Sequence, residues 1–210
     1  IEQILSSHSL IEGTQELPNI LAISRDIKLI DQKKGYPNNL LGLDQSSFDD
    51  LGKKYIDETK WARSSKPFFI DKMPNNFVHI GLIKLILPKA KIIDARRNPM
   101  DTCFSCFKQY FAKGQHFTYD LDDIARYYKD YVRLMDYWKK LFPEEIFTIN
   151  YEQVIDNPND RIRDLLEFCN VKFEDNCINF HKSKRPVKTA SSEQVRQPMY
   201  KTGLDYWKNY

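Results

Sequence analysis

The chain has no apolar run long enough to cross a membrane. The longest candidate, residues 79–87, is interrupted by Lys84, whereas a membrane-spanning helix needs about 20 apolar residues. The sequence also shows no signal-peptide pattern and no Asn-x-Ser/Thr acceptor site. We therefore expect a cytoplasmic protein that does not contact a membrane.

Cysteine is scarce, with only Cys103, Cys106, Cys169 and Cys177 in the chain. Cys103 and Cys106 lie three residues apart within a predicted helix, and no other metal ligands stand near them in the sequence. A metal centre would need a fuller ligand set. We expect reduced thiols, as in cytoplasmic proteins, and no bound metal.

The sequence also lacks a strong excess of charge of either sign. Its formal net charge is +3, with 41% hydrophobic and 29% charged residues, which is ordinary for a soluble globular protein. This charge is too small to indicate a nucleic acid partner. With 210 residues, we expect one domain over residues 1–210.

What the sequence does contain is a clear strand-to-helix junction after residue 91. The strand predicted over residues 91–96 is followed by Arg97 and then by a helix start. Asn98 can cap the first free N–H groups, Pro99 lacks an N–H where none is needed, and Asp101 places a carboxylate near the positive helix end. Such junctions in α/β proteins favour anions.

Arg97 and Ser105 are the first candidate ligand-binding pair. They lie eight residues apart, so an arginine at the strand end and a serine two helical turns later can hold one phosphate from two sides. The alternative is structural: Arg97 is an ordinary surface arginine, and the Ser105 hydroxyl bonds back to its own helix.

The remaining pattern predicts an α/β fold. Short strands are expected at residues 67–70, 91–96 and 146–149, the first of them buried on both faces, and residues 9–13 are expected to be extended. Helices are expected at residues 1–8, 18–32, 45–63 (capped by Ser46 or Ser47), 77–87, 121–141 and 157–169. Alternating strands and helices indicate one parallel sheet, whose strand ends would gather Lys72, Arg97 and Tyr151.

These residues resemble motifs of the sulfotransferases that use 3′-phosphoadenosine 5′-phosphosulfate (PAPS). Arg97-Asn98-Pro99 with Ser105 resembles their 3′-phosphate-binding segment. Asp71-Lys72-Met73-Pro74 resembles the lysine motif of tyrosylprotein sulfotransferases, and Asn150-Tyr151-Glu152 resembles the tyrosine segment near the nucleotide. Residues 189–200 resemble the nucleotide-covering segment of bacterial sulfotransferases that are often fused to tetratricopeptide repeats.

The resemblance implies a three-layer parallel α/β sheet, the sulfotransferase fold related to P-loop nucleotide kinases. In that family a strand and a phosphosulfate loop similar to P-R-S-G-T-T precede the helix that Ile1 opens here. We therefore expect this chain to be a sulfotransferase catalytic domain that begins just after that loop, with its first strand missing.

The resemblance also implies roles for individual residues. Arg97 and Ser105 would bind the 3′-phosphate, and Tyr151 would close over the adenosine together with a set of four C-terminal residues, Ser191, Gln194, Val195 and Arg196. Glu16 is the candidate general base, with Glu12 as its competitor, and Lys72 would neutralise the leaving oxygen. The reaction would need no metal.

The expected function is transfer of a sulfuryl group from PAPS to a hydroxyl or amine. The acceptor would be a small molecule, a glycan or a peptide tyrosine, contacted by the loop at residues 113–123, which carries His116, Phe117 and Tyr119. One alternative is a remnant that binds 3′-phosphoadenosine 5′-phosphate (PAP) without transferring sulfate. Another is a small-molecule kinase, against which the segment at residues 189–200 argues.

Overall fold

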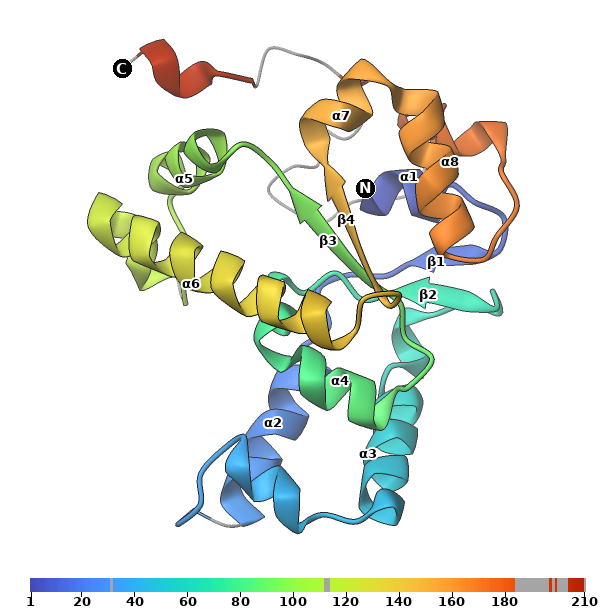
Figure 1. Cartoon of the computed structure of the whole chain (residues 1–210). Helices are drawn as coiled ribbons and strands as arrows, with labels where there is room; N and C mark the ends of the chain where they lie inside the picture. The colour runs from blue at the N-terminus through green and yellow to red at the C-terminus, as the bar shows by residue number, and fades with distance from the viewer. Residues whose placement is uncertain (31, 112–113, 184–196, 198, 200–203, 210) are drawn as a thin grey trace. The chain divides into compact units, whose positions relative to one another are not determined.

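The computed structural model describes residues 1–30, 32–111, 114–183, 197, 199 and 204–209. The described residues divide into two compact units, Glu2–Lys91 and Ile92–Tyr210, the second of which also includes Ile1. Figure 1 shows the helices and strands of each unit. The prediction of a single domain stays a prediction.

The unit Glu2–Lys91 is mostly helical and contains a short parallel strand pair. Its elements are α1 (Glu2–Ser6), β1 (Ile11–Gly13), α2 (Asn19–Ile30), η1 (Asn38–Gly42), α3 (Gln45–Glu58), η2 (Lys60–Ala62), β2 (Phe68–Ile70), η3 (Pro74–His79) and α4 (Ile80–Ile86). Apolar side chains of α2, α3 and α4 form its core, with Ile20, Ile23, Ile27, Tyr55 and Leu82 nearly inaccessible to solvent. The apolar face of α2 recurs every three to four residues, as expected for an amphipathic helix.

Strands β1 and β2 pair in parallel, with Ile11 opposite Phe68 and Gly13 opposite Ile70. The stretch at residues 9–13, predicted only as extended, is thus the partner of the predicted strand at residues 67–70. That strand is not buried on both faces as expected, because Phe68 is 48% exposed.

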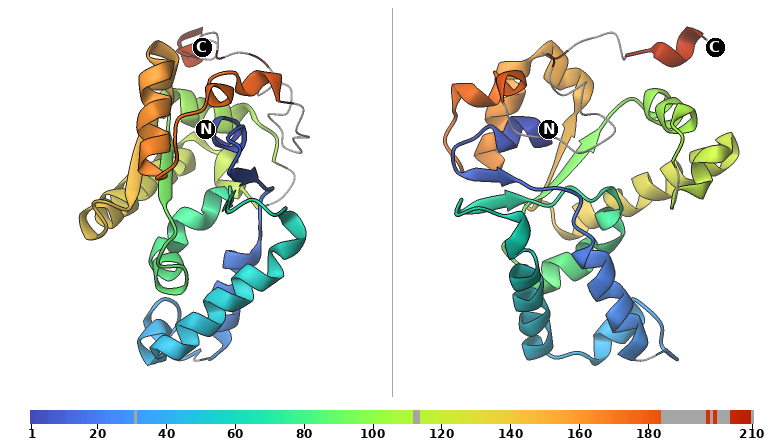
Figure 2. Two further views of the ribbon diagram at one scale, coloured as in Figure 1. Left: turned by 90° about the vertical axis from the view of Figure 1, so that its right-hand side faces the viewer. Right: turned by 180° about the vertical axis from the view of Figure 1, so that it is seen from behind.

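The unit Ile92–Tyr210 contains the second strand pair and four α-helices among its described residues. Its elements are β3 (Ile92–Arg96), α5 (Pro99–Lys108), η4 (His116–Tyr119), α6 (Leu121–Leu141), β4 (Ile146–Asn150), α7 (Tyr151–Asp156), α8 (Pro158–Phe168), η5 (Asp175–Cys177), η6 (Phe180–Lys182) and η8 (Tyr206–Asn209). Figure 2 shows α7 and α8 continuing directly from β4.

Strands β3 and β4 lie side by side in parallel, with Ile92 opposite Ile146 and Arg96 opposite Asn150. Because side chains alternate between the faces of a strand, Asp94 and Phe147 point to opposite faces. Helix α6 contacts the Asp94 face, where Lys139 lies 3.1 Å from the carboxylate. Helix α8 contacts the other face, where the rings of Phe147 and Phe168 stack with centroids 5.2 Å apart.

The predicted start of α5 is confirmed. The Asn98 side chain accepts a hydrogen bond from the Met100 N–H at 2.9 Å, with Pro99 and Asp101 in the first turn.

The predicted cap of α3 is wrong, because neither Ser46 nor Ser47 occupies the capping position. Asp44 does, and the hydroxyl and N–H of Ser47, followed by the hydroxyl of Ser46, hold the pKa of its carboxyl down at about 2.

The strands do not form one sheet as predicted. Among the described residues, β1 pairs with β2 and β3 pairs with β4, in two separate two-stranded sheets. A three-residue strand carries too short an apolar pattern to specify its partner, so the sequence correctly located the strands without specifying their pairing.

Close packing between α3 and α4 makes Gly52 a sensitive position. A Cβ built at Gly52 would lie 2.1 Å from the carbonyl oxygen of Ile86, a backbone atom that no rotamer change can move. We expect Gly52→Ala to lower the free energy of unfolding by about 1–3 kcal/mol, the cost of overpacking. Urea unfolding would measure this loss.

The matched control is Gly42→Ala. A Cβ at Gly42 meets nothing within 4 Å, so its effect should stay within about 0.5 kcal/mol. Equal stabilities of the Gly52 and Gly42 variants would contradict the predicted steric conflict.

Candidate functional site

The turn between β3 and α5 is held by hydrogen bonds of the Asn98 backbone and of the Asn98 side chain. The backbone N–H of Asn98 donates to Glu152 Oε1 at 2.8 Å, while the Asn98 side chain caps α5. Glu152 lies in the first turn of α7, which follows β4 directly. The ends of the two neighbouring strands are therefore linked through this turn.

Arg97 and Tyr151 meet at these strand ends. Arg96 is opposite Asn150 in the β3–β4 register, so the next residue of each strand emerges at the same level. The guanidinium carbon of Arg97 lies 5.3 Å from the centroid of the Tyr151 ring. A cation at this distance interacts favourably with the face of an aromatic ring.

Ser105 lies two helical turns into α5 and is exposed. Its neighbour Cys106 is partly buried, and burial raises the pKa of the Cys106 thiol while the positive charge of Arg97 lowers it. This electrostatic influence indicates that Arg97 lies near α5. The structure therefore brings Arg97, Tyr151 and the helix that carries Ser105 together within one unit.

Glu16 and Lys72 form a second pair, in the unit Glu2–Lys91. Lys72 Nζ lies 2.6 Å from Glu16 Oε1, with side chains 37% and 47% exposed. Glu16 follows β1 and Lys72 follows β2, so this pair also stands at the ends of two neighbouring parallel strands.

The competing carboxylate, Glu12, has different surroundings. It lies within β1, opposite Phe69, and accepts a hydrogen bond from the Ser64 hydroxyl. Glu16 has a cationic partner, whereas the partner seen for Glu12 is a neutral hydroxyl.

Asp71 lies next to Lys72 and is largely removed from solvent. Tyr55 donates to Asp71 Oδ2 at 2.8 Å, and Asn76 donates to the same atom at 3.2 Å. Burial raises the pKa of Asp71 above its ordinary value, while Tyr55, Asn76 and the N–H groups of Leu17 and Met73 act in the opposite direction. The sequence had indicated Asp71 only as a member of the Asp71-Lys72-Met73-Pro74 motif, without a role of its own.

The expected gathering of Lys72, Arg97 and Tyr151 is seen for Arg97 and Tyr151. Lys72 lies in the other unit, at the end of a different strand pair. Four predicted nucleotide-binding residues lie outside the described part of the chain: Ser191, Gln194, Val195 and Arg196.

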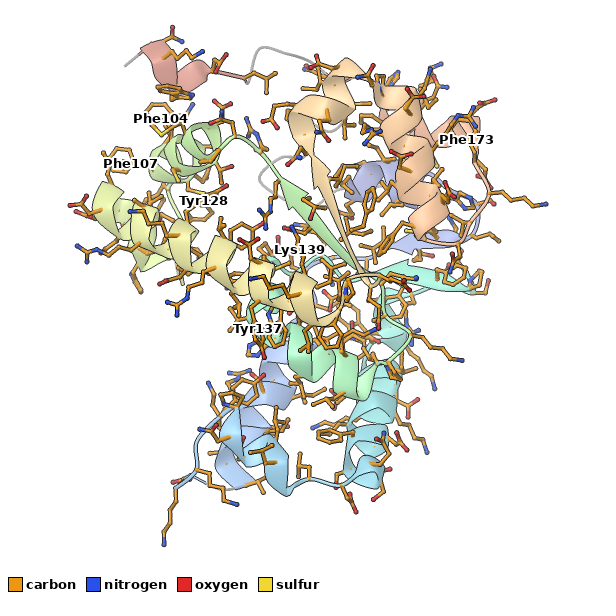
Figure 3. The ribbon with its side chains drawn as sticks, viewed as in Figure 1. Phe104, Phe107, Tyr128, Tyr137, Lys139 and Phe173 are labelled. Carbon is orange, nitrogen blue, oxygen red and sulfur yellow. The ribbon has the colours of Figure 1, made fainter. Side chains whose placement is uncertain are left out.

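Sequence reasoning missed a charged cluster around Asp94. This buried β3 carboxylate is 2.8 Å from Arg96 Nε and 3.1 Å from Lys139 Nζ, and it accepts a hydrogen bond from the Tyr131 hydroxyl. Figure 3 labels Lys139 on α6. An aspartate inside an otherwise apolar strand was the available signal, because a buried carboxylate requires partners.

The loop expected to contact the acceptor is partly helical. Phe117 of η4 stacks on Tyr127, with ring centroids 3.9 Å apart. Tyr119 helps to line a cavity of about 310 Å³. The other lining residues come from α5 and the start of α6: Phe107, Asp120, Leu121 and Asp122. Figure 3 labels Phe107 on α5.

The described residues contain neither a cluster of metal ligands nor a membrane-spanning helix. Within them, no three His, Cys, Asp or Glu side chains gather closely enough to hold a metal ion. In the same part of the chain, no helix combines the length and apolar character needed to span a bilayer.

Comparisons with known proteins point to one family. The model of the sulfotransferase family matches residues 1–175. A protein of Aquifex aeolicus (strain VF5), described as uncharacterized, is 37% identical over 218 aligned positions that include the whole of this chain. This chain spans 28% of the length of that relative.

A solved structure supports the same fold. The sulfotransferase domain from the curacin biosynthetic pathway superposes with a TM-score of 0.60. The superposition covers 91% of this chain and 76% of that domain, at 13% sequence identity. At this identity the likeness shows the fold alone.

The burial of Asp71 predicts a specific pH dependence. Because its folded pKa is raised above 3.8, the folded chain binds this proton more tightly than the unfolded chain. The resulting stabilisation is fully present below about pH 4 and is lost as pH rises through the folded pKa. The free energy of unfolding of the wild type minus that of Asp71→Asn should therefore fall with rising pH.

Urea unfolding between pH 4 and pH 7 would measure this difference, with Asp57→Asn as control. Lys60 lowers the pKa of Asp57, so the corresponding difference for Asp57 should rise with pH. A difference for Asp71 that also rises would contradict the assignment of burial as the dominant effect.

Proposed function

The chain belongs to the sulfotransferase family, and from this premise we propose that it transfers a sulfuryl group from PAPS to a hydroxyl or amine of an acceptor. The observation that carries the proposal is the β3–α5 turn, where Arg97 stands beside Tyr151 at the start of a capped helix. A cationic side chain at a helix N-terminus is suited to a phosphate. The finer fold assignment, a three-layer sheet related to P-loop kinases, rests on the resemblance and is part of this proposal.

Arg97 and Ser105 would bind the 3′-phosphate of the nucleotide. The guanidinium of arginine can donate two parallel hydrogen bonds to one phosphate, which fixes orientation as well as charge. Its contact with Tyr151 would restrict its motion before the nucleotide arrives. Tyr151 would also offer its ring to the nucleoside, together with four residues assigned by resemblance: Ser191, Gln194, Val195 and Arg196.

Glu16 and Lys72 would carry out the proton transfer and the charge stabilisation. The acceptor oxygen attacks sulfur in line, the bridging S–O bond breaks, and PAP leaves with an additional negative charge, by analogy with phosphoryl transfer. Glu16 would take the proton of the acceptor, and Lys72 would stabilise the leaving oxygen. The contact between the two side chains supports both assignments, since it places the candidate base beside the candidate cation.

The acceptor would bind near η4. Tyr119 lines the cavity of about 310 Å³ beside α5, and the loop that contains Tyr119 is the one for which sequence reasoning expected acceptor contacts. This cavity combines aromatic and carboxylate side chains, so it suits an acceptor with an apolar portion.

The assignment of Arg97 is tested by the variant Arg97→Ala. We expect at least a ~10-fold weaker affinity for PAP, because a charge-assisted hydrogen bond to phosphate is lost. Isothermal titration calorimetry with PAP would measure the change. Arg126→Ala is the matched control, since Arg126 is an arginine of the same unit with a side chain 74% exposed. Equal affinities for the Arg97 variant and the wild type would remove Arg97 from the site.

The assignment of Glu16 is tested by Glu16→Gln in a form of the chain extended at its N-terminus by a phosphosulfate loop. We expect PAP affinity within about twofold of the wild type and a loss of roughly 10²–10⁴-fold in turnover, the usual contribution of a general base. Transfer of labelled sulfate from PAPS would be followed, and transfer of labelled phosphate from ATP in the presence of Mg²⁺ would be the control reaction.

Glu12→Gln is the matched control for the base, and it should retain most of the turnover. Normal turnover in the Glu16 variant with loss in the Glu12 variant would transfer the role to Glu12. Transfer that depends on ATP instead of PAPS would identify a kinase and overturn the proposed function.

A further inference from the structure

Asp71 is the sequence neighbour of one member of the proposed catalytic pair, and its carboxylate is held by residues outside that pair. It precedes Lys72 directly at the end of β2, and its Oδ2 accepts hydrogen bonds from Tyr55 and Asn76. The Asp71 carboxylate is thus held in place by Tyr55 and Asn76, directly before the residue that carries the Lys72 ammonium. Neither bond is needed to complete a helix or a strand.

Tyr55 provides a rigid anchor for this carboxylate. It lies in α3, is only 2% exposed, and stacks on Phe69 of β2 with ring centroids 6.3 Å apart and an interplanar angle of 23°. A ring packed in this way has little rotational freedom. The position of Asp71 is therefore fixed relative to both α3 and β2.

Asp71 also reaches the segment that follows β1. The backbone N–H groups of Leu17 and Met73 lower the pKa of its carboxyl, against the larger effect of burial, and Leu17 is the fully buried neighbour of Glu16. The Thr14 hydroxyl donates to the carbonyl of Ile70 at 2.5 Å, a second link between the same two segments. The residues flanking Glu16 and Lys72 are thus connected while the two charged side chains remain accessible.

The ion pair needs this support. Glu16 and Lys72 are 47% and 37% exposed, and exposed ion pairs contribute little once the entropy of two long side chains is included. Such a pair does not hold its own geometry. We propose that Asp71 is a positioning residue, which fixes the turns after β1 and β2 so that Glu16 and Lys72 meet.

This inference rests on the proposed function for the meaning of the pair, but its geometry can be tested separately. A water-soluble carbodiimide joins a carboxylate to an amine only when the two are in contact. Treatment of the whole chain should produce a Glu16–Lys72 isopeptide, detected by peptide mass spectrometry. The Asp26–Lys54 pair, at 2.8 Å in the same unit, provides an internal reference whose cross-link should not change.

The decisive variant is Asp71→Asn. An amide carries no charge and replaces one carboxylate oxygen with an NH2 group, so it cannot accept from Tyr55 and Asn76 and also interact favourably with the N–H groups of Leu17 and Met73 as the carboxylate does. We expect the Glu16–Lys72 yield to fall at least ~3-fold relative to the Asp26–Lys54 yield. In the form of the chain extended by a phosphosulfate loop, kcat should fall ~10–100-fold, as expected for misplacement by about 1 Å, with KM for PAPS within about twofold of the wild type.

An unchanged cross-link yield in folded Asp71→Asn overturns the inference. If circular dichroism shows that this variant does not fold, Tyr55→Phe decides the question, because it removes only the hydroxyl that donates to Asp71. Tyr36→Phe is its control, since the Tyr36 hydroxyl contacts His79 at 2.9 Å, away from Asp71. A lower yield in Tyr55→Phe alone supports the inference, and equal yields in the two variants overturn it.

Different results would refute the proposed function and the role of Asp71. A wild-type chain that carries the loop but transfers no sulfate from PAPS would refute the proposed function. The cross-link yields of the Asp71 variant would still establish whether Asp71 positions the pair.

Discussion

The parallel register of neighbouring strands is the constraint on which both candidate pairs depend. In β3 and β4 the partners Arg96 and Asn150 end their strands at the same level, so Arg97 and Tyr151 meet without any long loop. In β1 and β2 the pairing of Gly13 with Ile70 has the same consequence for the segments that carry Glu16 and Lys72. A shift of the pairing register by one residue would turn the side chains of that strand to the opposite face and would separate the two members of each candidate pair.

An aspartate lies within one strand pair and directly after a strand of the other, and each accepts a hydrogen bond from a tyrosine of a packed helix. Tyr131 of α6 donates to Asp94 of β3, and Tyr55 of α3 donates to Asp71 after β2. Burial of a carboxylate is costly unless hydrogen bonds compensate for the lost water. Two such arrangements fix a helix to a strand through directional bonds, which specify geometry more sharply than apolar contact does. Asp94 differs in having two cationic neighbours, Arg96 and Lys139.

The sequence allowed reliable prediction where the signal was local. Asn98, Pro99 and Asp101 each favour a helix start for a separate reason, and α6 was predicted with its observed bounds because apolar residues recur over its whole length. Asp44 was missed as a cap because three of four consecutive residues, Asp44, Ser46 and Ser47, carry capping side chains within one turn. Local preference cannot choose among them.

Non-local features were beyond the reach of these patterns. The Glu16–Lys72 contact joins residues 56 positions apart, and it depends on the pairing of two three-residue strands. The same applies to Tyr55 and Asp71, since a buried tyrosine in a helix reads as an ordinary core residue. The family resemblance suggested roles for Glu16 and Lys72, but it did not indicate that they would contact each other or what would hold them.

The exposure of the Glu16–Lys72 pair is itself compatible with turnover. Lys72 would have to exchange a carboxylate oxygen for the leaving oxygen of the nucleotide during each cycle, and Glu16 must be able to accept a proton once Lys72 has moved. An exposed ion pair contributes about 0.2–1 kcal/mol, so separating it costs little, whereas a buried pair would resist separation. A pair that is weak in itself but held by rigid neighbours can therefore be both well placed and easily separated. The proposed role of Asp71 accounts for this combination, because Asp71 would fix the backbone turns and leave the exposed charged ends able to separate.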